Sequence, residues 1–319
     1  MSHRVPVTIV TGFLGAGKTT MIRNVLNDAA GEKIGLIVNE FGDMGFDGDM
    51  VRGCLDEDCT DDVVELTNGC LCCTVADDFV PALEALLKRS PDRIVIETSG
   101  LALPQPLIAA FGWPTVKPKV TVDAVVTLVD APAVLAGTFA TDPEAVAAQR
   151  SDDQLKAADL VLLSKVDDLG DTDIAAVRAR VSEDIREGVR ISEVGSAALF
   201  GVGAAAEENP AARDGHHSHD HDHEHDDFNS VVLPAAYASR DAAEAAIKAA
   251  MANPSILRIK GAVRLGDKPA PLMVQAVGPR LETWFGQPGA AAGGLVVIGL
   301  SPLPQDVLDQ LGEPAEALH

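Results

Sequence analysis

One glycine-rich segment near the N-terminus has the residue types and spacing of a phosphate-binding loop. Gly12–Thr19 reads Gly-Phe-Leu-Gly-Ala-Gly-Lys-Thr, between the apolar stretch Val5–Val10 and a segment of helical character. Glycines have no Cβ, so backbone N–H groups can surround a phosphate at the N-terminus of the following helix. Lys18 would contact the β- and γ-phosphates, and Thr19 would ligate Mg²⁺. This pattern predicts a P-loop rather than an empty turn. The expected nucleotide contacts are Gly12, Gly15, Ala16, Gly17, Lys18, Thr19 and Thr20.

A second candidate group is an acidic residue that follows an apolar run. Ile94–Ile96 leads into Glu97, and Gly100 comes shortly after. The carboxyl end of a core strand is where a Walker B carboxylate orders the water shell of Mg²⁺. Gly100 would let its N–H approach the γ-phosphate. An N-cap acid or a simple strand-end turn is the alternative. We expect Lys18, Thr19 and Glu97 to form the catalytic group for nucleotide hydrolysis.

A third element indicates which base is bound. The apolar run Leu160–Leu163 leads into Ser164-Lys165-Val166-Asp167. The Asp167 carboxylate can accept the N1–H and the exocyclic amine of guanine, whereas adenine has neither donor at these positions. The aliphatic stem of Lys165 can lie over the base. The usual motif has Asn at the position of Ser164, so one hydrogen bond has a shorter reach. The motif directly follows an expected core strand, and this position is what favours GTP over ATP as the bound nucleotide.

Three cysteines lie close together further along the chain. Cys70, Cys72 and Cys73 form a Cys-x-Cys-Cys motif, which on a tight turn can direct two or three sulfurs at one cation. Tetrahedral Zn²⁺ and Co²⁺ both suit such a donor set. An inert cysteine cluster and a redox thiol pair are the alternatives. Cys54 and Cys59 lie in an acidic, loop-like stretch and make a weaker case for a second metal site.

A histidine-rich run interrupts the second half of the chain. By composition, Gly215–His225 is a flexible chelator that would raise the local concentration of a divalent metal. A solvated linker with incidental metal affinity is the alternative interpretation. The auxiliary metal ligands expected here are His216, His217, His219, His221, His223 and His225.

Elements that position these groups follow an alternating pattern. Strands alternating with helices predict an α/β fold, a P-loop NTPase with a doubly wound, mostly parallel sheet, followed by a small α+β domain. We expect domains at 1–205 and 228–319, joined by a flexible linker at 206–227. The expected strands are Val5–Val10, Ile34–Asn39, Val63–Thr67, Ile94–Thr98, Val122–Val129, Leu160–Ser164, Ser230–Tyr237, Ile256–Leu265, Leu272–Val277 and Leu295–Leu300. The expected helices are Thr19–Asp28, Val75–Lys88, Glu144–Lys156, Asp173–Asp184 and Asp241–Met251.

The bulk composition limits the partners. The chain has 319 residues, a formal net charge of -23 and five cysteines. Such acidity argues against binding of nucleic acid or an anionic membrane surface. The N-terminus has no signal-peptide pattern, and the longest uncharged stretch, Gln287–Pro304, is broken by Gly and Pro. We therefore expect a cytoplasmic protein without membrane insertion, whose thiols are ligands rather than disulfides.

Taken together, these motifs resemble the CobW family of GTPases. The resemblance rests on Gly12–Thr19, on Asn68–Thr74 with the residues up to Phe79, on Glu97–Pro104 and on Ser164–Asp167. The His-rich run and the following small domain extend it over nearly the whole chain. The segments after the cysteines and after Gly100 look like the cobalamin-biosynthesis branch of the family.

That resemblance implies a GTP-dependent metallochaperone. Its cofactors would be GTP or GDP, Mg²⁺ and Co²⁺, although the residues alone leave Zn²⁺ equally open. It implies metal ligation by Cys70, Cys72 and Cys73 together with Glu40, and it places Glu40 and Asp43 in an acidic switch-like loop beside the nucleotide. The expected partners are a client protein such as a cobalt chelatase and a second copy in a nucleotide-dependent dimer. A zinc chaperone, a passive metal store or sensor, and a P-loop kinase are the competing hypotheses.

Overall fold

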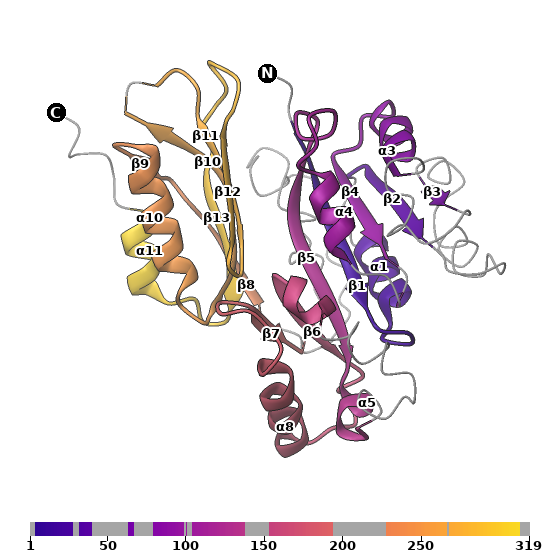
Figure 1. The fold of residues 1–319 in the computed structure, drawn as a ribbon. Helices are drawn as coiled ribbons and strands as arrows, with labels where there is room; N and C mark the ends of the chain where they lie inside the picture. The colour runs from indigo at the N-terminus through magenta and orange to yellow at the C-terminus, as the bar shows by residue number, and fades with distance from the viewer. Residues whose placement is uncertain are drawn as a thin grey trace, which may run out of the picture. The chain divides into compact units, whose positions relative to one another are not determined.

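The computed structural model describes the chain in several stretches. The described residues are 4–27, 32–39, 63–66, 79–98, 100, 104–137, 153–193, 228–266 and 268–312. The chain divides into two compact units, one of Arg4–Phe200 and one formed mainly by Gly201–His319 (Figure 1). The domain boundaries expected from the sequence, near residues 205 and 227, remain a prediction.

A parallel sheet forms the centre of the first unit. Among the described residues it has seven strands in the order β3-β2-β4-β1-β5-β6-β7, and every neighbouring pair is parallel. From β1 the chain continues to β2 on one side of the sheet, and from β4 it continues to β5 on the other. Ligands of open α/β sheets bind at the carboxyl ends of the strands where such a reversal occurs. The strands are β1 (Val5–Gly12), β2 (Ile34–Asn39), β3 (Val63–Leu66), β4 (Arg93–Glu97), β5 (Val120–Asp130), β6 (Leu160–Ser164) and β7 (Arg190–Ser192).

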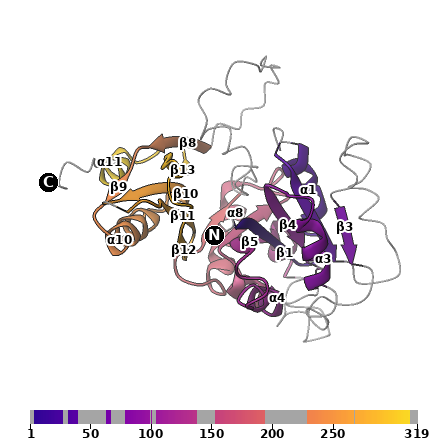
Figure 2. The same cartoon turned by 90° about the horizontal axis from the view of Figure 1, so that it is seen from above.

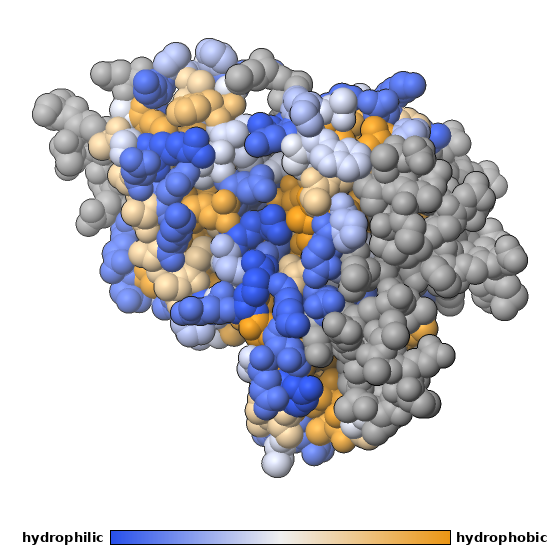
Figure 3. All heavy atoms as spheres, viewed as in Figure 1, coloured by the Kyte–Doolittle hydropathy of each residue, from blue (hydrophilic) through white to orange (hydrophobic). Residues whose placement is uncertain are grey.

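Helices cover this sheet, and its middle strands are buried accordingly. Every residue of β4 is buried, as are nearly all residues of β1 and β5, which requires cover on both faces. One apolar cluster joins α3 and α4 to β1, β4 and β5, and another joins α5 and α8 to β6 (Figure 2). Figure 3 shows hydrophilic residues along α8, whose charged residues are largely exposed. The helices are α1 (Lys18–Asn27), α3 (Val80–Leu87), α4 (Pro104–Ala110), α5 (Ala131–Leu135) and α8 (Asp171–Ser182).

The second unit is the expected small α+β domain. Its sheet has the order β12-β11-β10-β13-β8 with antiparallel neighbours, and β9 pairs in parallel with β10. Helices α10 and α11 pack on one face through a shared apolar cluster (Figures 1 and 2). The elements are β8 (Phe228–Leu233), β9 (Ala236–Tyr237), α10 (Arg240–Met251), β10 (Ile256–Leu265), β11 (Leu272–Val277), β12 (Arg280–Phe285), β13 (Gly294–Leu300) and α11 (Gln305–Leu311).

One expected strand is wrong, and several elements were not expected. Ser230–Tyr237 is two strands, because Pro234 has no N–H to continue a ladder, and β8 and β9 pair with different neighbours. Strands β7 and β12 and helices α4, α5 and α11 had no counterpart in the sequence-based expectation. Of the expected helices Val75–Lys88 and Glu144–Lys156, only the parts from residues 79 and 153 onward lie within the described residues.

A buried ion pair fixes the centre of the parallel sheet. Arg93 Nη1 lies 2.7 Å from Asp123 Oδ2, and the two side chains are 5% and 0% exposed. Asp123 is the residue at which the β1–β5 register shifts, since Val7 pairs with Val122 and Thr8 with Ala124. At this bulge, the Asp123 carboxylate reaches Arg93, the first residue of β4. Loss of Asp123 would remove the short contact of this buried guanidinium, which keeps a longer one of 3.8 Å between Arg93 Nε and Glu32 Oε2, and breaking a buried pair is strongly destabilising.

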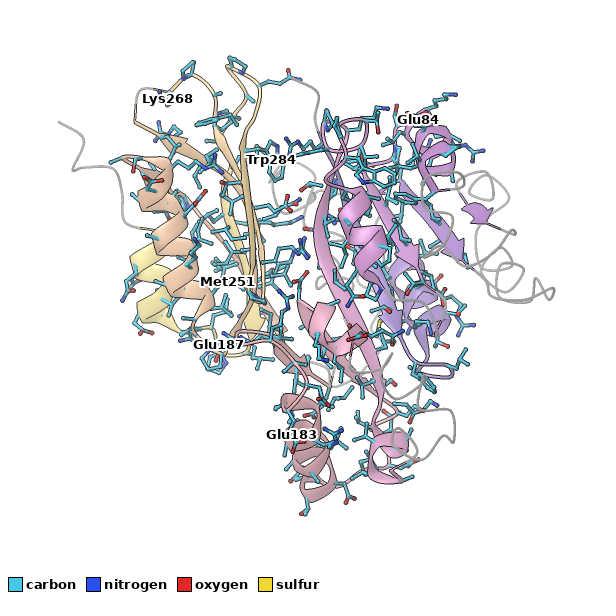
Figure 4. The ribbon with its side chains drawn as sticks, viewed as in Figure 1. Glu84, Glu183, Glu187, Met251, Lys268 and Trp284 are labelled. Atoms are coloured by element: carbon cyan, nitrogen blue, oxygen red, sulfur yellow. The ribbon has the colours of Figure 1, made fainter. Side chains whose placement is uncertain are left out.

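Asp123→Ala should therefore lower the free energy of unfolding by about 3–5 kcal/mol, measured by urea denaturation with circular dichroism. The matched control is the exposed pair of Lys119 Nζ and Glu84 Oε1, also 2.7 Å apart, in which Glu84 lies on α3 (Figure 4). Lys119 lowers the pKa of the Glu84 carboxyl through a hydrogen bond and its charge, but solvent screens this pair. Glu84→Gln should change stability little, and equal effects of the two substitutions would contradict the assigned role of Asp123.

Candidate functional site

Three glycines give the loop after β1 its shape. Gly12 has φ +138°, and a Cβ there would lie 2.3 Å from the Leu128 carbonyl oxygen, so no other residue fits against β5. Gly15 and Gly17 have φ +76° and +89° and face open space. Only glycine adopts these conformations without strain. The loop therefore bends with its backbone uncovered, as contact with a phosphate requires.

Lys18 lies inside this loop. It is 8% exposed, and its ammonium donates hydrogen bonds to the carbonyl oxygens of Gly12 at 2.8 Å and Phe13 at 3.1 Å. A buried ammonium needs such acceptors. The positive charge is therefore held within the glycine loop, at the N-terminus of α1, where the oxygens of a phosphate would take over part of its hydrogen bonding.

Thr19 and Glu97 come together beside the loop. The Thr19 hydroxyl donates to Glu97 Oε1 at 3.2 Å, although the two residues are far apart in sequence. Glu97 is the last residue of β4, pairs in register with Val10 and is 6% exposed. The next residue, Thr98, donates its N–H to the Val10 carbonyl at 2.9 Å and so continues the ladder to the strand end. A hydroxyl and a carboxylate are hard oxygen donors that suit Mg²⁺.

Gly100 lies against the loop as well. A Cβ at Gly100 would be 2.7 Å from the backbone nitrogen of Leu14, a distance that real side chains do not tolerate. Its carbonyl oxygen accepts a hydrogen bond of 3.1 Å from Nε2 of Gln154, a residue that is 1% exposed. The sequence analysis missed Gln154. Its neighbours Asp153 and Lys156 are polar as well, so the local sequence contains no signal that distinguishes it.

The expected base-binding residues follow β6. The Ser164 hydroxyl donates to the Val129 carbonyl at 3.1 Å, so this side chain stabilises the sheet edge. Lys165 has φ +58°, which is uncommon for a residue with a side chain, and its ammonium pairs with Asp130 Oδ2. Asp130 also caps α5 by accepting from the Ala133 N–H at 3.0 Å. Asp167 is exposed and accessible to a base. Asp130 was not foreseen.

Several residues singled out in the sequence lie outside the described residues. They are the expected metal ligands Glu40, Cys70, Cys72, Cys73 and the histidines of Gly215–His225, together with Asp43 of the acidic loop and with Cys54 and Cys59. Within the part of the chain that the structure describes, His, Cys, Asp and Glu side chains form no group of three or more that could hold a metal. No helix in that part is long and apolar enough to span a membrane.

Family models match both units. Residues 6–193 match the model described as CobW/HypB/UreG, nucleotide-binding domain, and residues 228–313 match the Cobalamin synthesis protein cobW C-terminal domain. The chain belongs to the CobW family. The phosphate loop, Thr19 and Glu97 thus lie in a CobW family nucleotide-binding domain, and the antiparallel sheet with α10 and α11 is the C-terminal domain of that family.

Curated relatives in the CobW family carry names that refer to zinc. The chain is 46% identical to "Zinc chaperone CobW" of Sinorhizobium sp, over 95% of this chain and 94% of that protein. It is 44% identical to the protein of the same name in Pseudomonas aeruginosa, over 88% of this chain and 83% of that protein. Among solved structures, Zn(II)-bound YjiA GTPase from E. coli is 21% identical with a TM-score of 0.44, over 100% of both chains.

Gly100→Ala should weaken binding of both GDP and a GTP analogue by about tenfold, because the added methyl group meets the Leu14 backbone and the loop must shift. Isothermal titration calorimetry measures both affinities. Gly170→Ala is the matched control, since a Cβ at Gly170 meets nothing within 4 Å. Wild-type affinity in the Gly100 variant would show that this close approach does not shape the nucleotide site.

Proposed function

We propose that this protein is a GTP-hydrolysing metallochaperone that binds zinc in a GTP-dependent way and delivers it to a client protein. The observation that carries the nucleotide part is the 3.2 Å contact between the Thr19 hydroxyl and Glu97 Oε1, directly beside the loop that holds Lys18. A glycine loop, a lysine, a hydroxyl and a carboxylate at one strand edge are the parts that P-loop NTP hydrolysis needs.

The hydrolysis reaction follows from these residues. Water attacks the γ-phosphorus, the bond to the oxygen that bridges the β- and γ-phosphates breaks, and GDP and phosphate leave. The Lys18 ammonium offsets the charge that develops on the phosphate oxygens, while backbone N–H groups of the loop hold the β-phosphate. Thr19 and Glu97 would hold Mg²⁺, which would supply further positive charge to offset the charge of the phosphates.

Guanine selection is assigned to the residues after β6. The exposed Asp167 carboxylate accepts the N1–H and the exocyclic amine of guanine. The ion pair with Asp130 fixes the end of the Lys165 side chain, so its aliphatic stem is held in place for contact with the base. The Ser164 hydroxyl already bonds to Val129, so Asp167 carries the selection.

The order of the strands supports coupling between the nucleotide and the metal. In register, Asn39 at the end of β2 pairs with Leu66 at the end of β3, and Val38 pairs with Glu97 at the end of β4. Neighbouring strands lie about 4.8 Å apart, so these three ends fall within about 10 Å. Glu40 directly follows β2, and the segment with Cys70, Cys72 and Cys73 follows β3.

In this proposal, GTP orders the segments that leave these strand ends, and the cysteine thiolates then bind the metal tightly. After hydrolysis the contacts to the γ-phosphate are lost, the thiolate site loosens, and the metal passes to the client. Linkage makes the effect reciprocal, so GTP tightens metal binding by the same factor by which metal tightens GTP binding.

Zinc is preferred to cobalt as the cargo because two relatives that match most of the chain are named zinc chaperones. Divalent zinc also binds nitrogen and sulfur donors more tightly than cobalt does. Cobalt and a cobalt chelatase as client, which the family resemblance implied, have only the description of the C-terminal domain model in their favour. A cytoplasmic location, a client protein and a nucleotide-dependent dimer belong to the same proposal.

Zinc affinity tests the coupling. With Mg²⁺ present, Zn²⁺ should bind the GTP-analogue form about 5- to 150-fold more tightly than the GDP form, as measured by competition with a chromophoric chelator. Cys72→Ser should abolish this difference, because a hydroxyl is a poor ligand for Zn²⁺ at neutral pH. A parallel titration with Co²⁺ ranks the two metals.

Cys54→Ser is the control, since it removes a thiol outside the Cys-x-Cys-Cys motif and should leave the difference intact. Equal Zn²⁺ affinity in the GDP and GTP-analogue forms of the wild type would instead support a passive store. Turnover that requires a phosphate acceptor and prefers ATP would support a kinase.

Base selection gives a second test. Asp167→Ala should lower affinity for GTP about 10- to 100-fold, because two hydrogen bonds to a charged acceptor are lost, and it should remove the preference for GTP over ITP, which lacks the exocyclic amine. Competition against a fluorescent GDP measures both. The neighbouring residue is also exposed and offers the control Asp168→Ala. A preference for GTP over ITP that persists in the Asp167 variant would mean that another residue selects the base.

A further inference from the structure

We infer that Gln154 is a positioning residue, which holds the Gly100 peptide in place for contact with the γ-phosphate of GTP. This inference rests on the proposed GTP-dependent function. Gln154 lies in the short helix 153–157, next to β6 and 54 positions from Gly100. Its Nε2 donates to the Gly100 carbonyl at 3.1 Å.

The surroundings of this amide make the hydrogen bond consequential. Gln154 is 1% exposed and Gly100 is buried, so water cannot readily replace the bond if it is lost. The Gly100 peptide is also confined from the other side, where the Leu14 backbone leaves no room for a side chain. Gly100 is therefore held between the phosphate loop and a buried amide.

The helix that carries Gln154 is itself anchored at the nucleotide edge of the sheet. The Thr127 hydroxyl donates to the Gln154 carbonyl at 3.3 Å. Thr127 pairs in register with Thr11, the residue directly before the glycine loop. On the surface, Gln105 Nε2 in α4 donates to the Asp153 carbonyl at 2.8 Å. These two bonds are made by the helix backbone, whereas the Gln154 side chain reaches the Gly100 carbonyl itself.

Preorganisation explains what such an anchor does. A γ-phosphate that approaches Gly100 gains a hydrogen bond from its N–H only if this peptide is already in place. With the hydrogen bond from Gln154, the Gly100 peptide loses its conformational entropy when the protein folds, before any nucleotide binds. Without it, the γ-phosphate must order the peptide as it binds, and affinity falls. GDP has no γ-phosphate and makes no such demand.

The experiment compares two affinities of the full chain with Mg²⁺ present, for GDP and for a non-hydrolysable GTP analogue, by isothermal titration calorimetry. Gln154→Met keeps the length of the side chain and removes the donor. It should weaken analogue binding about five- to tenfold, the effect of one net hydrogen bond, and leave GDP affinity unchanged. Gln154→Asn, whose amide falls one methylene short, should show the same loss and serves if the Met variant does not fold.

Two control variants separate positioning from packing. Thr127→Val removes a buried hydrogen bond to the Gln154 backbone, and Gln105→Ala removes an amide–carbonyl bond from the same helix, but neither touches Gly100. Each variant removes one of several contacts of the helix backbone and keeps the bond from Gln154 Nε2 to the Gly100 carbonyl, so both should retain the wild-type ratio of the two affinities. An unchanged ratio in the Gln154 variants, or an equal loss in Thr127→Val, overturns the inference. A wild type that binds neither nucleotide overturns the proposed function instead.

Discussion

Parallel strands end at a common edge of their sheet, and this constraint determines where chemistry can occur in this chain. The glycine loop follows β1, Glu97 ends β4, and the Ser164–Asp167 motif follows β6, so residues far apart in sequence meet above one edge. Burial of β1, β4 and β5 on both faces leaves the strand ends as the places where polar side chains reach a ligand. The buried pair of Arg93 and Asp123 keeps β4 and β5 aligned beneath that edge.

Groups that act through short local patterns could be predicted from the sequence. The loop from Gly12 to Thr19 is contiguous, and Glu97 follows an apolar run that reads as a core strand, so the contact between Thr19 and Glu97 followed from the fold class. Gln154 and Asp130 could not be predicted in this way. Each acts by a contact between distant segments, and one buried amide or one capping carboxylate has no recognisable spacing.

The missed elements have equally local causes. Strand β12 lies at an edge of its sheet and mixes polar with apolar residues, with neither regular alternation nor a long apolar run, and β7 has only three residues, so neither gives a clear strand signal. Pro234 divided what looked like one strand into β8 and β9. The identity of the cargo metal is a different kind of limit. Three thiols suit zinc and cobalt alike, and selection between them depends on the supply of metal and on the client.

The hydrogen bonds of Lys18 have a consequence for any anion that enters the loop. Its ammonium bonds to the Gly12 and Phe13 carbonyls, so these carbonyls satisfy the buried charge within the loop itself. An incoming ligand must compete with these carbonyls for the same ammonium. A lone phosphate ion has no ribose or base contacts to offset this competition, whereas a whole nucleotide has both.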